Sequence, residues 1–274
     1  MYLILMLFSC GLSKKATTQT ISDSLPTNSI RKILAEPRQV EVDRLGFVYV
    51  FTKSNSLVRY STRDNSKVEY VDNRLGRIHD FDVTNPLSIN VFYKQYGVLK
   101  ILDNTLSNIK TINFLASEAF QNVTSVCTAN DGNIWIFDET VQKIYKVKSD
   151  FEILVESNRL SDLGLGKVEI LKMREVNNRL IVLVKGKGFY IFDNFGQFLK
   201  IIRADYFSSF QVIDEMIMQC NQGRCNFYAI DGIESNSKVI KMELLPNLMD
   251  VKRSGKDWIL TYLNGIDLRQ EIFE

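Results

Sequence analysis

The sequence predicts an all-β fold, a six-bladed β-propeller of four-stranded antiparallel blades whose last blade is closed by the N-terminal strand. Three observations lead to it. A unit of short strands, clearest at residues 128–157, recurs roughly every 40 to 46 residues. Asp-Asn or Asp-Gly pairs follow the third strand at matching places in three repeats. The last repeat is one strand short, and residues 30–34 supply a strand of the missing type.

The clearest repeat shows why these residues form a blade. Its innermost strand, residues 123–127, carries the small and β-branched side chains that suit a crowded central axis. The turn Asn130-Asp131-Gly132 leads into residues 133–137, a strand that is apolar on both faces. Such a strand must be covered on both sides. Residues 143–147 and 151–155 complete the unit as less buried outer strands.

The other blades follow the same pattern. In chain order we expect strands at 39–42, 47–51, 57–60 and 68–71; 78–83, 89–93, 98–102 and 109–114; 168–173, 180–184, 189–192 and 198–202; 210–213, 216–220, 225–230 and 239–244; and 249–251, 258–263 and 266–273. The last group lacks its outermost strand, which residues 30–34 provide. Sharing one blade between the two chain ends hides edges that would otherwise be exposed.

Composition narrows the function. The 274 residues carry a formal net charge of +2 and no long cluster of Lys or Arg, so we expect no nucleic-acid partner. A single His makes zinc sites and catalytic triads built on His unfavourable. The sequence contains no P-loop, dinucleotide fingerprint, Gly-x-Ser-x-Gly elbow or His-Glu-x-x-His motif. We therefore expect no catalytic residues, no bound metal and no cofactor.

The first ten residues, MYLILMLFSC, are apolar but too short to span a bilayer. Leu7-Phe8-Ser9-Cys10 matches the end of a bacterial lipoprotein signal, so we predict lipid attachment at Cys10. The alternative is an ordinary buried strand with a free thiol. Residues 11–28, rich in Thr, Ser and Lys, are predicted to form a flexible tether. Residues 29–274 would then form one propeller domain.

Cys220 and Cys225 flank a four-residue turn. Paired across a hairpin, their Cβ atoms would approach bridging distance, and export would place them in an oxidising compartment. We predict a disulfide, with two half-buried thiols as the alternative. Cys127 is interpreted as a small residue of an inner strand.

His79 begins the second blade and is followed by Asp80 and Asp82. In that position His79 and Asp80 could face the central channel and bind a ligand or cation, although a purely structural role for the His is the simpler interpretation. Trp135 and Trp258 are explained by packing between blades. The remaining conspicuous acids are interpreted as turn formers, namely Asp43, Asp131, Asp193 and Asp231.

Taken together, the motif ending at Cys10, the strand openings at Asp43–Val48 and Asp131–Phe137, and the segment 82–94 resemble one family. This is the six-bladed propeller lipoproteins of the Bacteroidota type, with NHL- or YVTN-like blades. The resemblance implies an accessory subunit of outer-membrane secretion or assembly machinery. It implies a non-catalytic scaffold or adaptor that binds a protein partner. Residues 11–16 lack the acids that usually accompany surface export in that group, which favours the periplasmic face of the outer membrane.

Two other functions stay open on the sequence. One is a propeller hydrolase or lactonase with a metal in the channel, because scattered Asp and Asn residues are compatible with such a site. The other is a periplasmic protein that binds carbohydrate or peptide.

Overall fold

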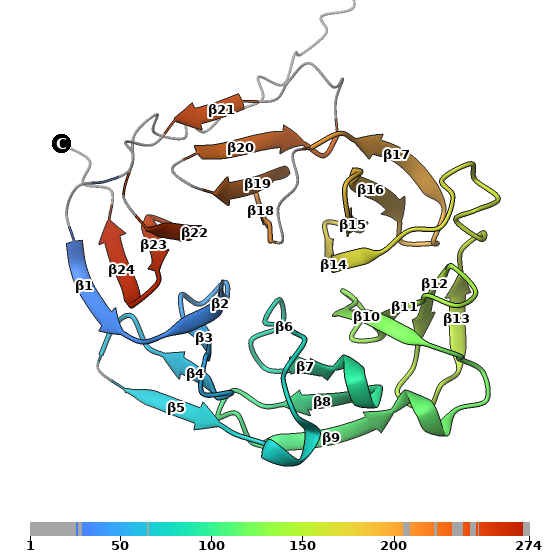
Figure 1. The fold of residues 1–274 in the computed structure, drawn as a ribbon, viewed down its shortest axis with the longest axis horizontal. Coiled ribbons are helices and arrows are strands. Elements are labelled where there is room, and N and C mark those ends of the chain that lie inside the picture. Colours follow the sequence, from blue (N-terminus) through green and yellow to red (C-terminus); the bar gives the residue numbers. More distant parts are fainter. Residues whose placement is uncertain are drawn as a thin grey trace, which may run out of the picture.

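Six four-stranded antiparallel sheets surround a central axis (Figure 1). The computed structural model describes Pro26 and residues 29–64, 66–204, 209–221, 224–231, 238–241, 245 and 247–270. The predicted all-β propeller is confirmed, including a last blade that takes its outermost strand from the start of the chain. The predicted signal at 1–10 and nearly all of the tether at 11–28 lie outside the described residues.

Within each blade, the first strand named is the innermost and the last is the outermost. Blade 1 contains β2 (Pro37–Val42), β3 (Val48–Thr52), β4 (Leu57–Tyr60) and β5 (Lys67–Tyr70). Blade 2 contains β6 (Asp80–Asp82), β7 (Ile89–Tyr93), β8 (Val98–Leu102) and β9 (Asn108–Asn113). Blade 3 contains β10 (Val123–Thr128), β11 (Ile134–Asp138), β12 (Lys143–Val147) and β13 (Ile153–Glu156).

The second half of the ring repeats the arrangement. Blade 4 contains β14 (Ile170–Val176), β15 (Arg179–Val184), β16 (Gly188–Asp193) and β17 (Phe198–Ile202). Blade 5 contains β18 (Gln211–Ile213), β19 (Met216–Asn221), β20 (Arg224–Ala229) and β21 (Lys238–Lys241). Blade 6 contains β22 (Leu248–Ser254), β23 (Asp257–Tyr262), β24 (Gly265–Gln270) and β1 (Ser29–Leu34).

Three short 3-10 turns are the only helical elements of the described chain: η1 (Asn73–Leu75), η2 (Lys94–Tyr96) and η3 (Phe114–Ala116). Within the described ranges, no helix has the length and apolar character needed to cross a membrane.

Burial falls from the inside of each blade to the outside. Every residue of β3, β7 and β11 is buried, whereas β9 and β13 are largely exposed. The second strands are buried because neighbouring blades cover both of their faces. Trp135 of β11 packs in one cluster with Met173 of blade 4, and Trp258 of β23 packs in another with Met218 of blade 5. Packing between blades therefore accounts for both Trp residues.

The ring closes where β1 pairs with β24, shown at the left of Figure 1. Ile33 lies opposite Ile266, and the two belong to a cluster that also contains Val40 and Val48 of blade 1. At the start of β1, the Ser29 hydroxyl donates a hydrogen bond of 2.5 Å to Asp267. This pairing covers the edge of blade 6 and completes its contact with blade 1.

The antiparallel order gives the propeller two distinct faces. The N-terminal ends of the innermost strands reach one face, together with the loops between second and third strands and the loops between blades. We call it the N face. Their C-terminal ends reach the other, the C face, together with the loops that join first to second and third to fourth strands. The chain enters β1 at the C face.

Strand boundaries differ from the expected ones mainly around polar residues. The sequence ends the first strand of blade 4 at residue 173, whereas β14 continues to Val176. The added residues include Arg174 and Glu175, which are buried because they find charged or polar partners on other blades. Residues 242–244 and 271–273, placed in strands by the sequence, lie outside the described residues.

Replacing Ile33 by Ala should test the closure. Ile33 is 6% exposed and its neighbour Leu34 is 91% exposed, so the two positions form a matched pair on one strand. We expect Ile33→Ala to lower the free energy of unfolding by about 2–5 kcal/mol because it leaves a cavity between blades 6 and 1. Leu34→Ala should change it by less than about 0.5 kcal/mol. Urea unfolding measures both, and equal losses would contradict the closure.

Candidate functional site

Polar side chains alternate along the innermost strands, at positions i and i+2. Since alternate residues of a strand point to the same side, each such pair faces the central channel together. The pairs are Gln39 and Glu41 on β2, Asp80 and Asp82 on β6, Lys172 and Arg174 on β14, and Asp250 and Lys252 on β22.

Blade 4 supplies two cations that cross the channel. Lys172 Nζ donates a hydrogen bond to Glu41 on blade 1. Arg174 binds Asp80 on blade 2 with both terminal nitrogens, at 3.0 and 3.3 Å. Its Nε also lies 3.5 Å from a carboxylate oxygen of Asp82. These contacts join blade 4 to blade 1, directly across the ring, and to blade 2.

Arg174 and Gln39 add further hydrogen bonds to this network. Arg174 donates to the backbone oxygens of Met173 at 2.6 Å and Phe81 at 2.7 Å. The Gln39 amide donates to Asp80 at 2.8 Å and to Glu41 at 3.1 Å. A buried charge is tolerated when it is paired and hydrogen-bonded, as these are.

Carboxylates also fasten neighbouring blades to each other. Asp82 accepts the backbone N–H of Thr128 on blade 3 at 2.8 Å. Glu175 on blade 4 accepts the indole N–H of Trp135 at 2.7 Å and the backbone N–H of Asn130 at 3.0 Å, both on blade 3.

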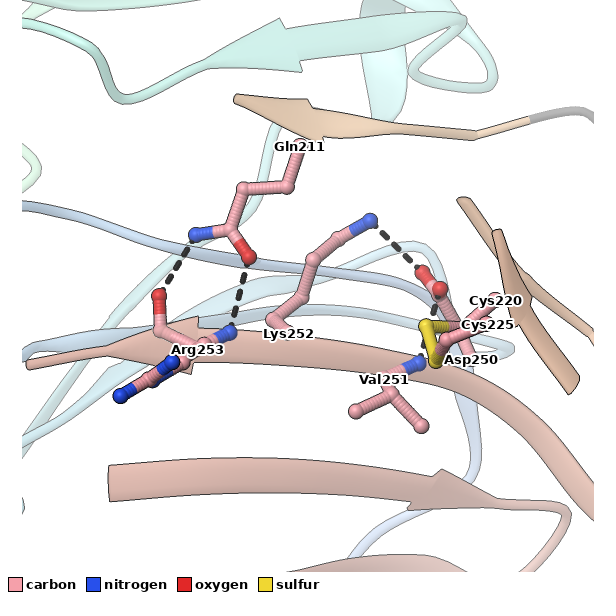
Figure 2. Close-up of a disulfide and its surroundings, with 7 residues drawn as sticks. All are labelled: Gln211, Cys220, Cys225, Asp250, Val251, Lys252 and Arg253. Carbon is pink, nitrogen blue, oxygen red and sulfur yellow. Dashed lines mark hydrogen bonds and ion pairs between the residues drawn. A yellow bond between two sulfur atoms is a disulfide. The ribbon is translucent and has the colours of Figure 1, made fainter. Parts of the chain in front are cut away.

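The contact between blades 5 and 6 is drawn in Figure 2. Lys252 Nζ lies 2.9 Å from Asp250, as Figure 2 shows. It also donates a hydrogen bond to Ser209, just before β18, at 2.7 Å. The Gln211 side chain bonds both the N–H and the carbonyl of Arg253, at 2.8 and 2.7 Å. The Gln211 amide thus adds hydrogen bonds between blades 5 and 6, at a place where the innermost strand of blade 5, β18, is short.

Burial and charge act in opposite directions on the two channel acids. Burial alone would raise the pKa of Asp80, but Arg174, Lys172 and the hydrogen bonds to the carboxylate outweigh it and lower that pKa. Burial also opposes ionisation of Glu41, and Lys172, Lys252 and Arg174 lower its pKa overall. Both groups are therefore held as carboxylates.

The channel cations respond differently. Burial opposes the charge of Arg174, yet the three carboxylates around it raise its pKa above the usual value. Burial and the nearby cations Arg174 and Lys252 lower the pKa of Lys172, despite the Glu41 carboxylate.

Two cavities lie at the ends of the channel. The N-face pocket, of about 310 Å³, is lined by Lys172 and Asp80. The C-face pocket, of about 460 Å³, is lined by Glu41 and Arg174. The Lys172–Glu41 and Arg174–Asp80 pairs each join a residue of one pocket to a residue of the other, so these two pairs lie between the cavities.

His79 and Asp80 both line the N-face pocket, but they are not engaged with each other through a hydrogen bond. Asp80 binds Arg174 and Gln39 instead. The His79 ring packs edge-on against Phe92 with centroids 6.3 Å apart. His79 is exposed on the pocket wall. Partial burial of its ring lowers its pKa, and Asp80 opposes that shift. The predicted role of the two residues as a ligand or cation site stays a prediction.

A disulfide joins Cys220 and Cys225, which lie opposite each other on β19 and β20 with Cα atoms 4.1 Å apart (Figure 2). Cys220 also lines the N-face pocket, so the bond fixes part of its wall. Cys127 is a free thiol buried in β10, and burial raises its pKa well above the usual value. A thiol in this state is a poor nucleophile.

The turn acids behave as structural residues. Asp43 accepts the backbone N–H of Phe47 at 2.9 Å, Asp131 that of Asn133 at 3.0 Å, and Asp193 that of Gln197 at 2.8 Å. Across the described part of the chain, no group of three or more His, Cys, Asp or Glu side chains is arranged to hold a metal ion.

Sequence reasoning found Asp80 but missed the residues that neutralise it. The available signal was the polar alternation on the innermost strands, most clearly Lys172-x-Arg174 and Glu41 in otherwise apolar segments. It identifies channel-facing positions but does not say which blades oppose each other.

No family model matches this chain, and no curated protein matches it either. Solved structures do. Virginiamycin B lyase from Staphylococcus aureus has 11% identity, with 89% of each chain covered and a TM-score of 0.54. The Pan2 WD40 domain from Neurospora crassa has 11% identity, with 88% of this chain and 90% of that chain covered and a TM-score of 0.52. BBS1N in complex with ARL6DN has 12% identity, with 88% and 94% covered and a TM-score of 0.55. At these identities the likeness shows the propeller fold.

Replacing Arg174 by Met should reveal the energetic role of the channel network. The change strands Asp80 in the interior without its main partner, so we expect a loss of about 3–5 kcal/mol at neutral pH, measured by urea unfolding. In the double variant Arg174→Met, Asp80→Asn the stranded charge is removed, and part of the loss should be recovered. Additive losses would show that the two residues do not interact.

Acid should weaken the unmodified protein through the same network. Because the folded-state pKa values of Asp80 and Glu41 are lowered, these carboxylates stabilise the fold above their unfolded pKa values of about 4. That stability is lost as the pH falls through the lower folded values. Urea unfolding from pH 7 down to pH 2 should show a steeper decline for the unmodified protein than for the double variant.

The disulfide has a direct chemical test, because trypsin cleaves after Arg224, between Cys220 and Cys225. An oxidised pair will keep two tryptic peptides joined until a reductant is added, whereas reduced thiols will give separate alkylated peptides. The peptide containing Cys127 serves as the control, since it should be alkylated without reduction once the protein is denatured. Mass spectrometry of digests with and without reductant distinguishes the two states.

Proposed function

We propose that this protein is a non-catalytic β-propeller scaffold that binds a protein partner, tethered by a lipid on Cys10 to the periplasmic face of the outer membrane. The main observation behind the proposal is that the charged side chains in the channel form ion pairs with one another. Glu41, Asp80 and Asp82 each contact a cation from blade 4, and their removal from these contacts would leave buried charges unpaired.

This arrangement favours a structural role for the channel. A general acid or base needs a proton-transfer group within reach of a substrate and a pKa near the working pH. The pKa values of Asp80 and Glu41 are instead shifted away from neutrality by their partners. Ion pairs between opposite blades hold the ring in one shape, and a ring of fixed shape presents its loops as a preorganised surface.

Two further observations support a binding protein at a membrane. The segment Leu7–Cys10 has the pattern of a lipoprotein signal, and the residues after it have the composition of a tether. One structure of similar fold, BBS1N, was solved as a complex with a second protein, ARL6DN, which illustrates the use of this fold for protein binding. The proposal of a place in secretion or assembly machinery rests on the family resemblance of the sequence.

A second candidate is the binding of a small polar molecule, such as a carbohydrate, in the N-face pocket. Among the described residues, Glu41 is the only hydrogen-bond acceptor for the Lys172 ammonium, which has three N–H donors and lines this pocket. His79 and Asp80 lie on the same wall, so they are also where the metal-dependent hydrolase alternative would place its chemistry. Virginiamycin B lyase, a protein of similar fold, is an enzyme, so the test below also includes an enzymatic alternative.

The leading proposal predicts a stable complex. Affinity purification of the tagged full-length protein from detergent-solubilised membranes should recover one partner in constant ratio. Cys10→Ala should release the protein from the membrane fraction. The second candidate would be supported instead by two results. The protein would be recovered without a partner, and a sugar would raise its melting temperature in a way that the channel variant His79→Ala abolishes.

A further inference from the structure

Charged residues are segregated between the two faces of the propeller. Acids dominate the loops and strand ends of the C face in the described chain: Asp43, Asp64, Asp103, Asp131, Asp150, Glu152, Asp193, Asp214, Glu215, Asp231 and Asp257. The corresponding bases are fewer: Arg44, Arg63, Lys67, Lys148, Arg179, Lys238 and Lys256. Of the acids, Asp43 is buried. The C face is therefore negative overall.

Bases dominate the N face. Those in its described loops are Lys53, Arg74, Arg77, Lys94, Arg159, Lys167, Lys185, Lys187 and Arg203. The acids of the same loops are Glu36, Asp72, Glu118, Glu139, Asp162 and Glu169, of which Asp72 is buried. A protein whose two faces differ in charge orients an approaching charged partner toward one of them.

Exposed apolar side chains of the N face gather on one half of the ring. They belong to blades 6, 1 and 2: Leu34, Val71, Tyr96, Leu115, Met249 and Leu263. Leu34 is 91% exposed and Leu115 is 67% exposed. Large apolar groups gathered beside cations are typical of a binding surface, whereas isolated ones are common on any protein.

Contacts between loops make this region continuous. Lys53 N donates to the carbonyl of Glu36, two residues beyond Leu34, at 2.8 Å. Asn55 then bonds the carbonyl of Gly76 at 2.8 Å, next to Arg77. These hydrogen bonds join the loop after β1, the loop between β3 and β4, and the loop that leads into blade 2.

Two glycines mark where the neighbouring apolar side chains lie. A Cβ on Gly76 would lie 3.5 Å from the Tyr96 ring, and a Cβ on Gly97 would lie 3.0 Å from Cγ of Leu115. Tyr96 therefore lies against the backbone at Gly76, and Leu115 lies against the backbone at Gly97. We call the surface formed by Leu34, Lys53, Arg77, Tyr96 and Leu115 the rim strip.

The cations of the rim strip are available to a partner. Lys53 and Arg77 are exposed, and neither forms an ion pair with a carboxylate of the described residues. Rim charges of this kind raise the rate and selectivity of association, while neighbouring apolar groups supply the contact that holds the complex.

Chain direction places the rim strip away from the predicted anchor. Arg269, near the C-face end of β24, binds the carbonyl of Pro26 at 3.2 Å, so the chain reaches the propeller at the C face. The predicted tether from Cys10 would therefore join the propeller on the face opposite the rim strip. The chain's own residues 1–25 do not match the rim strip, because they carry Lys14 and Lys15 against a single Asp23.

We propose that the rim strip docks an acidic segment of the partner protein, a segment in which carboxylates alternate with large apolar side chains. This inference rests on the proposed scaffold function and identifies its binding face. Carboxylates of the segment pair with Lys53 and Arg77, and its apolar side chains pack against Tyr96, Leu115 and Leu34.

The test uses the full-length protein and defined probes. A fluorescein-labelled peptide with alternating glutamate and leucine or phenylalanine should bind, with affinity that falls as salt rises. A peptide of the same charge without apolar residues, and a basic apolar peptide, should bind at least about tenfold more weakly. Fluorescence polarisation measures all three.

Variants on the two faces separate the rim strip from general electrostatics. Lys53→Glu with Arg77→Glu, and separately Leu115→Ser, should each weaken binding of the acidic apolar peptide about tenfold. The C-face controls, Arg44→Glu with Arg63→Glu and separately Leu87→Ser, should change it by less than about twofold. Thermal unfolding confirms that every variant is folded. Equal effects on both faces would overturn the inference, as would absence of peptide binding.

The same variants distinguish failure of this inference from failure of the proposed function. If the membrane complex survives the rim-strip variants and is lost with the C-face variants, the scaffold proposal stands and the assigned face is wrong. If no complex forms even with the unmodified protein, the scaffold proposal fails, and the peptide measurement alone decides the inference. Binding of phosphatidylglycerol vesicles that depends on the rim strip, or self-association through it, would also overturn the docking of an acidic protein segment.

Discussion

The pairing of β1 with β24 is the constraint on which the rest of the structure depends. Each second strand is apolar on both faces, so every blade needs a neighbour on each side, and only a closed ring gives one to all six. The outermost strand of blade 6 comes from the start of the chain. Its residue Ile33 packs in one apolar cluster with residues of blade 6 and blade 1. Without that strand the last sheet would keep an open edge.

Closure of the ring does not by itself determine how the side chains in the central channel are arranged. In the channel, ion pairs take the place of the apolar packing found between blades. Lys172 and Arg174 extend from blade 4 to Glu41, Asp80 and Asp82 on blades 1 and 2. Buried ion pairs contribute little net stability compared with apolar groups of the same shape, but removing one partner is costly. Their effect is therefore on geometry: they specify which side chains meet across the axis. The outer faces are free of that constraint, and there the charges separate by face.

Most of the fold could be predicted from the sequence because its information is local. The Asp-Asn and Asp-Gly turns mark hairpins, and alternating or fully apolar runs mark strands between them. The channel network could not be predicted in the same way, because Lys172 and Glu41 are 131 positions apart and Arg174 and Asp80 are 94 apart. The predicted end of the first strand of blade 4 was wrong for the same reason. A charged residue such as Arg174 looks like the end of a strand until its buried partner is known. The rim strip likewise depends on which loops become neighbours after the ring has formed.

Joining the first strand to the last also has a consequence for biosynthesis. Ser29 and its partner Asp267 are separated by 238 positions, so the opening strand leaves the ribosome long before its mate is translated. At typical elongation speeds that interval is on the order of ten to fifty seconds. Throughout it, the nascent chain must keep residues 29–34 from pairing with the wrong edge. Contacts between positions so far apart in the chain carry a high loop-closure cost, so closure of the ring is expected to be slower than the formation of individual blades.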